Sequence, residues 1–187
     1  MTAIAAIAEK GKVWMGGDSA GVAGLSLTIR KDEKVFKKGP FLIGFTSSFR
    51  MGQLLRWKFK PPVHAKGLET INYMHMSFID KVRECFKEGG YAKIENNTEH
   101  AGAFIVGYKG ELFTIESDFQ IGQPLDGFAC CGCGDDLACG SLTTTAQYEI
   151  RPQDRIALAL HAAERYSAGV RRPFLILDSE GHKWTIE

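Results

Sequence analysis

Short apolar runs separated by turn residues make up the beginning of the chain. The runs are 2–9, 12–18, 34–38 and 41–47. Glycine follows the first run at Gly11 and the third at Gly39, where it permits the tight turn of a hairpin. This pattern predicts that the chain opens with two pairs of β-strands.

Two segments with helical spacing come next. Residues 49–59 end before Pro61, and residues 68–88 place apolar side chains at steps of three and four until Gly89 stops the pattern. The same reasoning predicts strands at 102–108, 111–115 and 127–131, helices at 135–147 and 152–168, and strands at 173–178 and 182–186. Strand groups that alternate with helix pairs indicate an α+β fold, in which two antiparallel sheets pack between two helical layers as a four-layer αββα sandwich.

Length and composition are those of an ordinary globular domain. The chain has 187 residues, of which 44% are hydrophobic and 24% charged, and a net charge of +1. We expect a single domain over 1–187. No apolar run approaches the roughly 20 residues of a membrane helix, and no basic segment leads an apolar one at the N-terminus, so we expect a cytoplasmic protein without a membrane partner.

Basic residues are concentrated between 30 and 66, where ten Lys or Arg face only two acidic residues. Aromatic residues alternate with them at Phe36, Phe41, Phe49, Trp57 and Phe59, as on a surface for single-stranded nucleic acid. We interpret these aromatics as core positions and the charges as solvated faces of a strand and a helix. Nucleic-acid binding by 30–66 stays an alternative function that the sequence does not favour.

The five cysteines have two chemical interpretations besides free thiols. Four of them fall within ten residues, at Cys130, Cys131, Cys133 and Cys139. A structural zinc site needs a second ligand pair, which is missing, so we expect no metal. A cysteine nucleophile at Cys133 would gain from a helix N-terminus, but the acidic residues that follow oppose that effect. An odd number of closely spaced cysteines is typical of reduced thiols.

Thr2 is the first candidate for catalysis. Removal of the initiator methionine would place its hydroxyl beside a free α-amine, whose pKa of about 7.7–8.0 leaves it substantially neutral near physiological pH. Such a residue carries a nucleophile and a base together. Many proteins have a threonine at position 2, however, so a catalytic role for Thr2 has to be supported by other residues of the sequence.

Three segments provide that context: Thr2-Ala3-Ile4, Gly16-Gly17-Asp18 and Lys34-Val35. They resemble the start of proteasome β-subunits and of the bacterial HslV peptidase, which are N-terminal-nucleophile (Ntn) hydrolases. In that family the catalytic aspartate lies sixteen residues after the threonine and the lysine sixteen after the aspartate. Thr2, Asp18 and Lys34 have both spacings. A buried carboxylate that orients an ammonium beside a hydroxyl lowers the cost of forming the alkoxide.

The resemblance implies further site residues. The family strand that matches 40–48 contributes a backbone N–H to the oxyanion hole, and counting from Lys34 assigns this role to Ser48, or to Ser47 after a slip of one residue. Gly132-Cys133-Gly134 aligns with a family Gly-Ser-Gly whose serine helps to transfer the proton of the threonine amine. Cys133 takes the place of that serine, and a thiol is the weaker hydrogen-bonding group, which predicts less efficient proton transfer.

A segment near the end of the chain, Glu164 to Gly169, is similar to a proteasomal Asp-x-x-Ser-Gly motif near the nucleophile. It gives Glu164 and Ser167 supporting roles. The resemblance thus implies a threonine peptidase without a cofactor, active on peptides or unfolded proteins after removal of Met1. It also implies self-association into double rings and an ATP-dependent unfoldase as a partner. The alternative is a ring or scaffold protein that keeps the fold without the chemistry.

Overall fold

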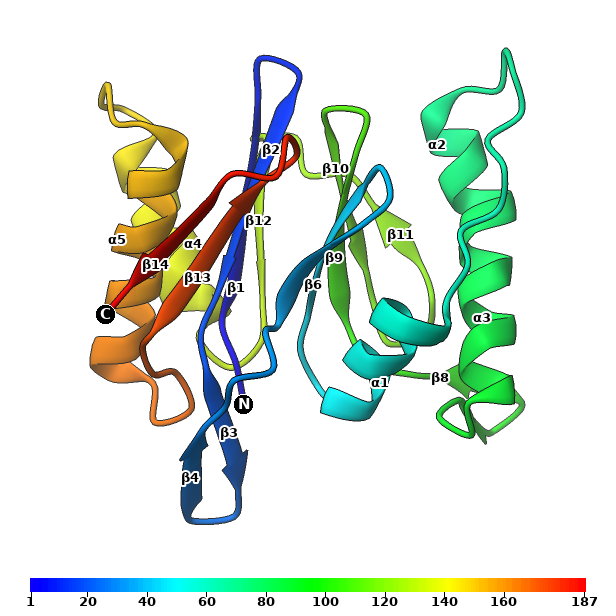
Figure 1. Ribbon diagram of the computed structural model, residues 1–187, viewed down its shortest axis with the longest axis horizontal. Coiled ribbons are helices and arrows are strands. Elements are labelled where there is room, and N and C mark those ends of the chain that lie inside the picture. The colour runs from blue at the N-terminus through cyan, green and yellow to red at the C-terminus, as the bar shows by residue number, and fades with distance from the viewer.

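The computed structural model describes all of residues 1–187 and has four layers (Figure 1). Two five-stranded sheets face one another, and helices cover the outer face of each. All pairings within both sheets are antiparallel. The predicted αββα sandwich is therefore confirmed.

The first sheet contains both ends of the chain. Its strand order is β12-β1-β2-β13-β14. The first strand pairs with the second through the turn at Lys10 and Gly11, as the sequence predicts. The bounds are β1 (Ile4–Glu9), β2 (Lys12–Gly17), β12 (Phe128–Cys131), β13 (Phe174–Asp178) and β14 (Lys183–Ile186).

The second sheet has the order β11-β10-β9-β6-β5. Its first hairpin turns at Gly39, which has a φ of 57° and so adopts the left-handed conformation that favours glycine. The strands are β5 (Val35–Lys38), β6 (Phe41–Phe45), β9 (Phe104–Tyr108), β10 (Glu111–Ile115) and β11 (Ile121–Gly122).

Each helical layer belongs to one sheet (Figure 1). Helices α4 (Asp135–Thr145) and α5 (Pro152–Tyr166) cover the first sheet. The second sheet is covered by two compound helices that contain π-helical turns. They are α1 (Phe49–Gln53) with η1 (Leu54–Lys58), and α2 (Thr70–Tyr73) with η2 (Met74–Phe78) and α3 (Ile79–Glu88).

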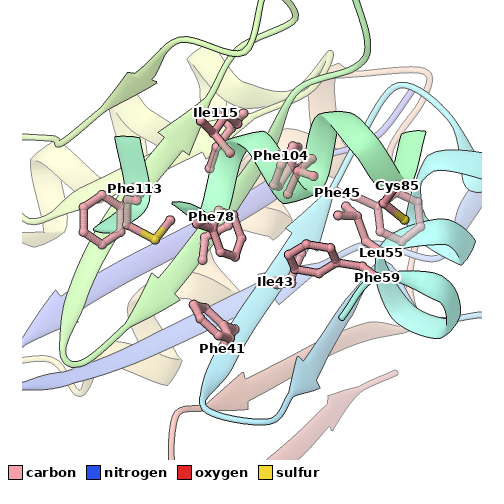
Figure 2. Packing of buried hydrophobic residues seen from close by; sticks show 14 of the residues in the cluster. Phe41, Ile43, Phe45, Leu55, Phe59, Phe78, Cys85, Phe104, Phe113 and Ile115 are labelled. Atoms are coloured by element: carbon pink, nitrogen blue, oxygen red, sulfur yellow. The ribbon is translucent and has the colours of Figure 1, made fainter. Parts of the chain in front are cut away.

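Apolar side chains fill all three spaces between the layers. The largest cluster lies under the α1–α3 layer, where Figure 2 shows Phe41, Phe59 and Phe78 close together. The ring centroids of Phe41 and Phe78 are 5.1 Å apart. A second cluster lies between the first sheet and α4/α5, and a third between the two sheets. Core formation between the sheets fixes the position of Ile4 and thereby of the residues before it.

Two small hairpins were not predicted. They consist of β3 (Ala20–Ala23) with β4 (Ser26–Ile29), and of β7 (Lys93–Glu95) with β8 (Thr98–His100). Both lie outside the two large sheets, and β4 and β7 are exposed along their whole length. A strand without a buried face has no alternation of apolar and polar residues to reveal it. None of the helices is both long enough and apolar enough to cross a bilayer.

The turn between β13 and β14 depends on one buried carboxylate. Oδ1 of Asp178 accepts hydrogen bonds from the backbone N–H groups of Glu180, Gly181 and His182 at 2.7–3.0 Å. Burial acts to raise the pKa of Asp178, but hydrogen bonds from His182 and Gly181 outweigh burial and leave the pKa below its ordinary value.

We expect Asp178→Ala to lower the free energy of unfolding by about 1–3 kcal/mol, because it leaves these N–H groups without their acceptor. A carboxyl with a lowered folded-state pKa stabilises the fold above its unfolded pKa of about 3.9 and loses this contribution as the pH falls through the folded value. Urea unfolding at pH 7 and below pH 4 should therefore show a difference that shrinks in acid. Glu180→Ala, on the same turn, is the control and should stay within about 0.5 kcal/mol of wild type.

Candidate active site

Thr2 lies just before β1, between the two sheets, and is only 4% exposed. Its backbone N–H donates to Sγ of Cys133 at 3.2 Å, and its carbonyl accepts from the N–H of Gly134 at 3.3 Å. The hydroxyl of Thr2 donates to the carbonyl oxygen of Met1. The start of the chain is thus held against the turn that joins β12 to α4.

Asp18 and Lys34 form a buried ion pair beside Thr2. Asp18 follows β2 and Lys34 precedes β5, so the pair joins one strand end from each sheet. Nζ of Lys34 lies 2.7 Å from Oδ1 of Asp18, and the side chains are 1% and 0% exposed. The same Oδ1 accepts the N–H of Ala3 at 3.1 Å. The ammonium is therefore held next to the residue that follows Thr2.

Backbone groups satisfy the other carboxylate oxygen. Oδ2 of Asp18 accepts the N–H of Ala20 at 2.9 Å and that of Arg171 at 3.3 Å. A buried carboxylate whose oxygens both accept hydrogen bonds is held in one orientation. Four segments of the chain meet at this one side chain.

The charge of Lys34 is set by two opposing effects. Burial lowers the pKa of Lys34 below the ordinary value of a lysine, and the Asp18 carboxylate opposes this shift. An ammonium that is paired yet poorly solvated interacts strongly with any negative charge that forms beside it. This arrangement suits the stabilisation of an alkoxide at Thr2.

The turn 132–134 fits against Thr2 because it contains glycine. Gly132 has a φ of 109°, and a Cβ there would lie 2.2 Å from the carbonyl oxygen of Thr2. Only glycine combines this conformation with such close approach. The conformation of this turn and its contact with Thr2 therefore require glycine at the first position of the Gly-Cys-Gly sequence.

Cys133 connects the turn to the end of α5. Its Sγ lies 3.4 Å from Oγ of Ser167, which in turn accepts the N–H of Gly169 at 3.4 Å. Ser167 is thereby brought to the site, as the resemblance implies. Glu164 is not in contact with Thr2: its carboxylate binds Arg172, with Oε2 at 2.9 Å from Nε and Oε1 accepting the backbone N–H.

The two serines after β6 differ in the availability of their backbone donors. The N–H of Ser48 donates to the carbonyl of Thr46 at 2.7 Å, and the Ser48 hydroxyl caps α1 by accepting from the N–H of Arg50. Ser47 adopts a φ of 66°, and its own hydroxyl accepts from the N–H of Ala103 at 3.2 Å. The backbone N–H of Ser47 makes no hydrogen bond within the chain.

A small cavity of about 60 Å³ joins these groups. Thr2 and Lys34 line it together with Thr46, Ser47 and Ser48. Phe45 and Phe49 line this cavity and also a larger one of about 350 Å³ that extends to Arg56 and Trp57. The predicted nucleophile, its cation and the segment of the predicted oxyanion donor thus share one space.

Arg171 is a site residue that the sequence did not reveal. Its N–H contacts Asp18 across 153 residues, and a backbone donor leaves no residue-type signal. Four of the ten basic residues in the segment 30–66 form ion pairs: Arg30 with Asp32, Lys34 with Asp18, Arg56 with Glu33 and Lys58 with Glu88. The interpretation of its aromatics as core holds for Phe36, Phe41 and Phe59, and Phe49 packs against the same cluster while partly buried; it is wrong for Trp57, which is 75% exposed.

Solved structures provide the comparison with known proteins. No protein-family model and no curated protein matches the sequence. The BPH protein of Thiobacillus denitrificans, in complex with epoxomicin, superposes with a TM-score of 0.79 at 14% identity, over 100% of both chains. Eukaryotic HslV from Trypanosoma brucei gives 0.67 at 14% identity, over 95% of this chain and 98% of that one.

A third similar structure is a Gly-1 mutant of Anbu from Hyphomicrobium sp. strain MC1. Its TM-score is 0.71 at 15% identity, over 100% of this chain and 87% of that chain. Each similarity extends over nearly the whole length of this chain. Because the sequence identities are low, the similarities establish the fold alone. The chain therefore has the proteasome-like Ntn-hydrolase fold of HslV, BPH and Anbu, which the spacing of Thr2, Asp18 and Lys34 indicated.

Proposed function

We propose that this protein is a threonine peptidase that hydrolyses peptide bonds with Thr2 after removal of Met1. One observation carries the proposal: Oδ1 of Asp18 binds both Nζ of Lys34 and the N–H of Ala3, which holds an ammonium beside Thr2 in a shared cavity. The low accessibility of Lys34 argues against a surface role for this lysine. Asp18 orients Lys34, Lys34 provides a positive charge beside Thr2, and the Thr2 hydroxyl is the nucleophile.

The reaction follows from these positions. The Thr2 hydroxyl attacks the peptide carbonyl while the free α-amine, acting through water, takes its proton. A C–O bond forms, the C–N bond breaks, and the proton passes to the leaving amine. Water then hydrolyses the ester and restores Thr2. Lys34 stabilises the alkoxide, and Cys133 and Ser167 contact the amine side of the site, where they would transfer its proton.

We assign the oxyanion donor to the backbone N–H of Ser47. Counting along the sequence assigns this role to Ser48, or to Ser47 after a slip of one residue, and the N–H of Ser48 already donates to the carbonyl of Thr46. Ser47 lines the cavity of Thr2, and its N–H is free to bind an oxyanion. The turn 132–134 would add stabilisation from the other side of Thr2.

The structural neighbours support a wider proposal. Because HslV, BPH and Anbu match over almost the full chain, we infer that residues 1–187 act as one domain that assembles into rings with the sites inside. Peptides and unfolded proteins would be the substrates, and an ATP-dependent unfoldase the partner. The free thiols of all five cysteines are in keeping with a reducing cytoplasm.

One observation favours a second candidate, a catalytically inactive ring protein. While Met1 is attached, the nitrogen of Thr2 is an amide whose N–H donates to Cys133, so it has no basic lone pair. A chain that keeps Met1 would retain the fold and the assembly without the chemistry. The state of the N-terminus therefore separates the two candidates.

The deciding experiment uses the protein from its own host. N-terminal sequencing should find Thr2 as the first residue, and a peptide epoxyketone such as epoxomicin should form a covalent adduct on it. This probe has two electrophilic carbons, which the hydroxyl and the free amine of one threonine can attack together. Thr2→Ala should abolish both the adduct and peptide hydrolysis, whereas Thr2→Ser, which keeps the hydroxyl, should retain both.

Retention of Met1 in the assembled protein, or a processed protein that forms no adduct, would contradict the peptidase proposal and favour the inactive ring. Hydrolysis that survives in Thr2→Ala would place the nucleophile elsewhere.

Cys133→Ser is expected to increase the rate of peptide hydrolysis by about tenfold. The change is equivalent to about 1.4 kcal/mol, the net size of one ordinary hydrogen bond, because a hydroxyl is a better donor and acceptor than a thiol for the Thr2 amine. Steady-state kcat of the processed wild type and variant gives the answer. Cys133→Ala should be slower than wild type, and equal rates for Ser and Ala would show that this side chain takes no part in proton transfer.

A further inference from the structure

The thiol of Cys133 is placed differently from the other four. Cys85 is buried and Cys130, Cys131 and Cys139 are partly buried, whereas Cys133 is exposed. Its Sγ lies 3.2 Å from the nitrogen of Thr2. A sulfur atom that can react with solutes is thus in contact with the nitrogen that the proposed mechanism uses as its base.

We propose that Cys133 is an oxidation site whose sulfenic acid condenses with the α-amine of Thr2, which closes the active site reversibly through a sulfur–nitrogen bond. This inference rests on the proposed function, because it needs the amine that removal of Met1 creates. The oxidant is a hydroperoxide, for which hydrogen peroxide is the simplest example.

Two steps convert the thiol and the amine into the sulfenamide. The Cys133 sulfur attacks a peroxide oxygen, the O–O bond breaks, and Cys133 becomes a sulfenic acid with release of water. The Thr2 nitrogen then attacks this sulfur, the S–O bond breaks, and a second water leaves as the sulfenamide forms. The protein loses two hydrogens in total. A small thiol reverses the bond by attacking the sulfur, which returns the amine and leaves a mixed disulfide that a second thiol reduces.

Local geometry favours the amine as the partner of Cys133. The N–H of Gly134 donates to the Thr2 carbonyl at 3.3 Å. This hydrogen bond already holds the backbone next to Cys133 against Thr2, the two residues that the new bond would join. Cys130 on β12 and Cys139 on α4 have one another, and not Cys133, as the main influence on their pKa values. Cys133 has Ser167 and Thr2, not another cysteine, as its side-chain and backbone neighbours.

Formation of this bond would stop catalysis in a defined way. The nitrogen of a sulfenamide is far less basic than an amine, so it no longer accepts the proton of the Thr2 hydroxyl. The side chain of Cys133 also becomes fixed across the amine side of the nucleophile. A serine, which the family resemblance implies at this position, could not undergo this reaction. Cys133 in its place would therefore make the site sensitive to peroxide while lowering the efficiency of proton transfer.

The test uses residues 2–187 released from an N-terminal fusion partner that leaves Thr2 free, which removes any dependence on processing. Untreated protein is assayed for hydrolysis of a small peptide amide, and each variant is compared with its own untreated activity. After treatment with hydrogen peroxide, intact mass should fall by the two hydrogens. A peptide map without reductant should join the N-terminal peptide to the peptide that contains Cys133, and dithiothreitol should restore both the separate peptides and the activity.

Two variants make the test specific. Cys133→Ser should form no cross-link and keep its activity in peroxide. Cys139→Ser should behave like wild type, which matters because a hydrogen bond from Cys130 lowers the pKa of Cys139 to about 7 and makes it the competing thiol. Inactivation that Cys139→Ser prevents, or Cys133 recovered only as sulfinic acid or in a disulfide, would overturn the inference. Absence of hydrolysis in the untreated protein would contradict the peptidase proposal, while the cross-link would still be scored by mass.

Discussion

Lys34→Ala is expected to abolish peptide hydrolysis and to lower the free energy of unfolding by about 3–5 kcal/mol. The substitution removes the only cation that contacts Asp18, whose side chain is completely buried. Three backbone N–H groups remain around the carboxylate, but none carries a full charge. The variant therefore contains an uncompensated buried charge as well as a nucleophile without its ammonium.

Urea unfolding and a peptide-amide assay on the same preparation measure the two effects. The double variant Asp18→Asn, Lys34→Met removes both charges, and we expect it to recover most of the stability but none of the activity. Lys66→Ala, at an exposed lysine of the same basic segment, should stay within about 0.5 kcal/mol of wild type. Near-normal turnover in a folded Lys34→Ala protein would remove Lys34 from the proposed mechanism.

Gly132→Ala is expected to reduce hydrolysis by at least about 100-fold, because it displaces the turn that holds Thr2. The new Cβ would lie 2.2 Å from the Thr2 carbonyl oxygen, and backbone atoms cannot move aside as a flexible side chain can. The left-handed φ of 109° adds conformational strain. Strain and overpacking together should cost roughly 2–4 kcal/mol of stability.

A second glycine nearby provides a matched control. A Cβ at Gly140 in α4 would meet no atom within 4 Å. Gly140→Ala should therefore preserve activity and stabilise the protein by about 0.4–1 kcal/mol, since alanine is the better helix residue. Thermal unfolding and the rate of adduct formation by an epoxyketone report on both variants. If Gly132→Ala is as active as Gly140→Ala, the turn does not position Thr2.

The layers of the fold could be predicted because their sequence patterns are strong. The strand pair at 2–18 and the helix at 68–88 have a buried face, which leaves a periodic pattern of apolar residues. The β3–β4 hairpin has almost no buried face, and so its pairing is visible only in three dimensions. The π-helical turns in the two compound helices change local geometry without changing the residue pattern.

Side-chain members of the site were easier to predict than backbone members. Asp18 and Lys34 followed from a spacing of sixteen residues in each direction, and the ion pair at 2.7 Å shows that they meet. The N–H groups of Ala3, Ala20 and Arg171 also bind Asp18, but any residue except proline can supply an N–H. The choice between Ser47 and Ser48 likewise depended on which N–H was already used, which sequence cannot show.

The convergence of residues 3, 20, 34 and 171 on one carboxylate ties the chemistry to the order in which the chain is made. During synthesis the threonine emerges first, whereas Arg171 emerges only when the chain is nearly finished. A nascent chain therefore contains Thr2, Asp18 and Lys34 long before it can hold them in place. The centre that we propose for peptide hydrolysis would therefore form only once Arg171 and the last strands of the first sheet are in place.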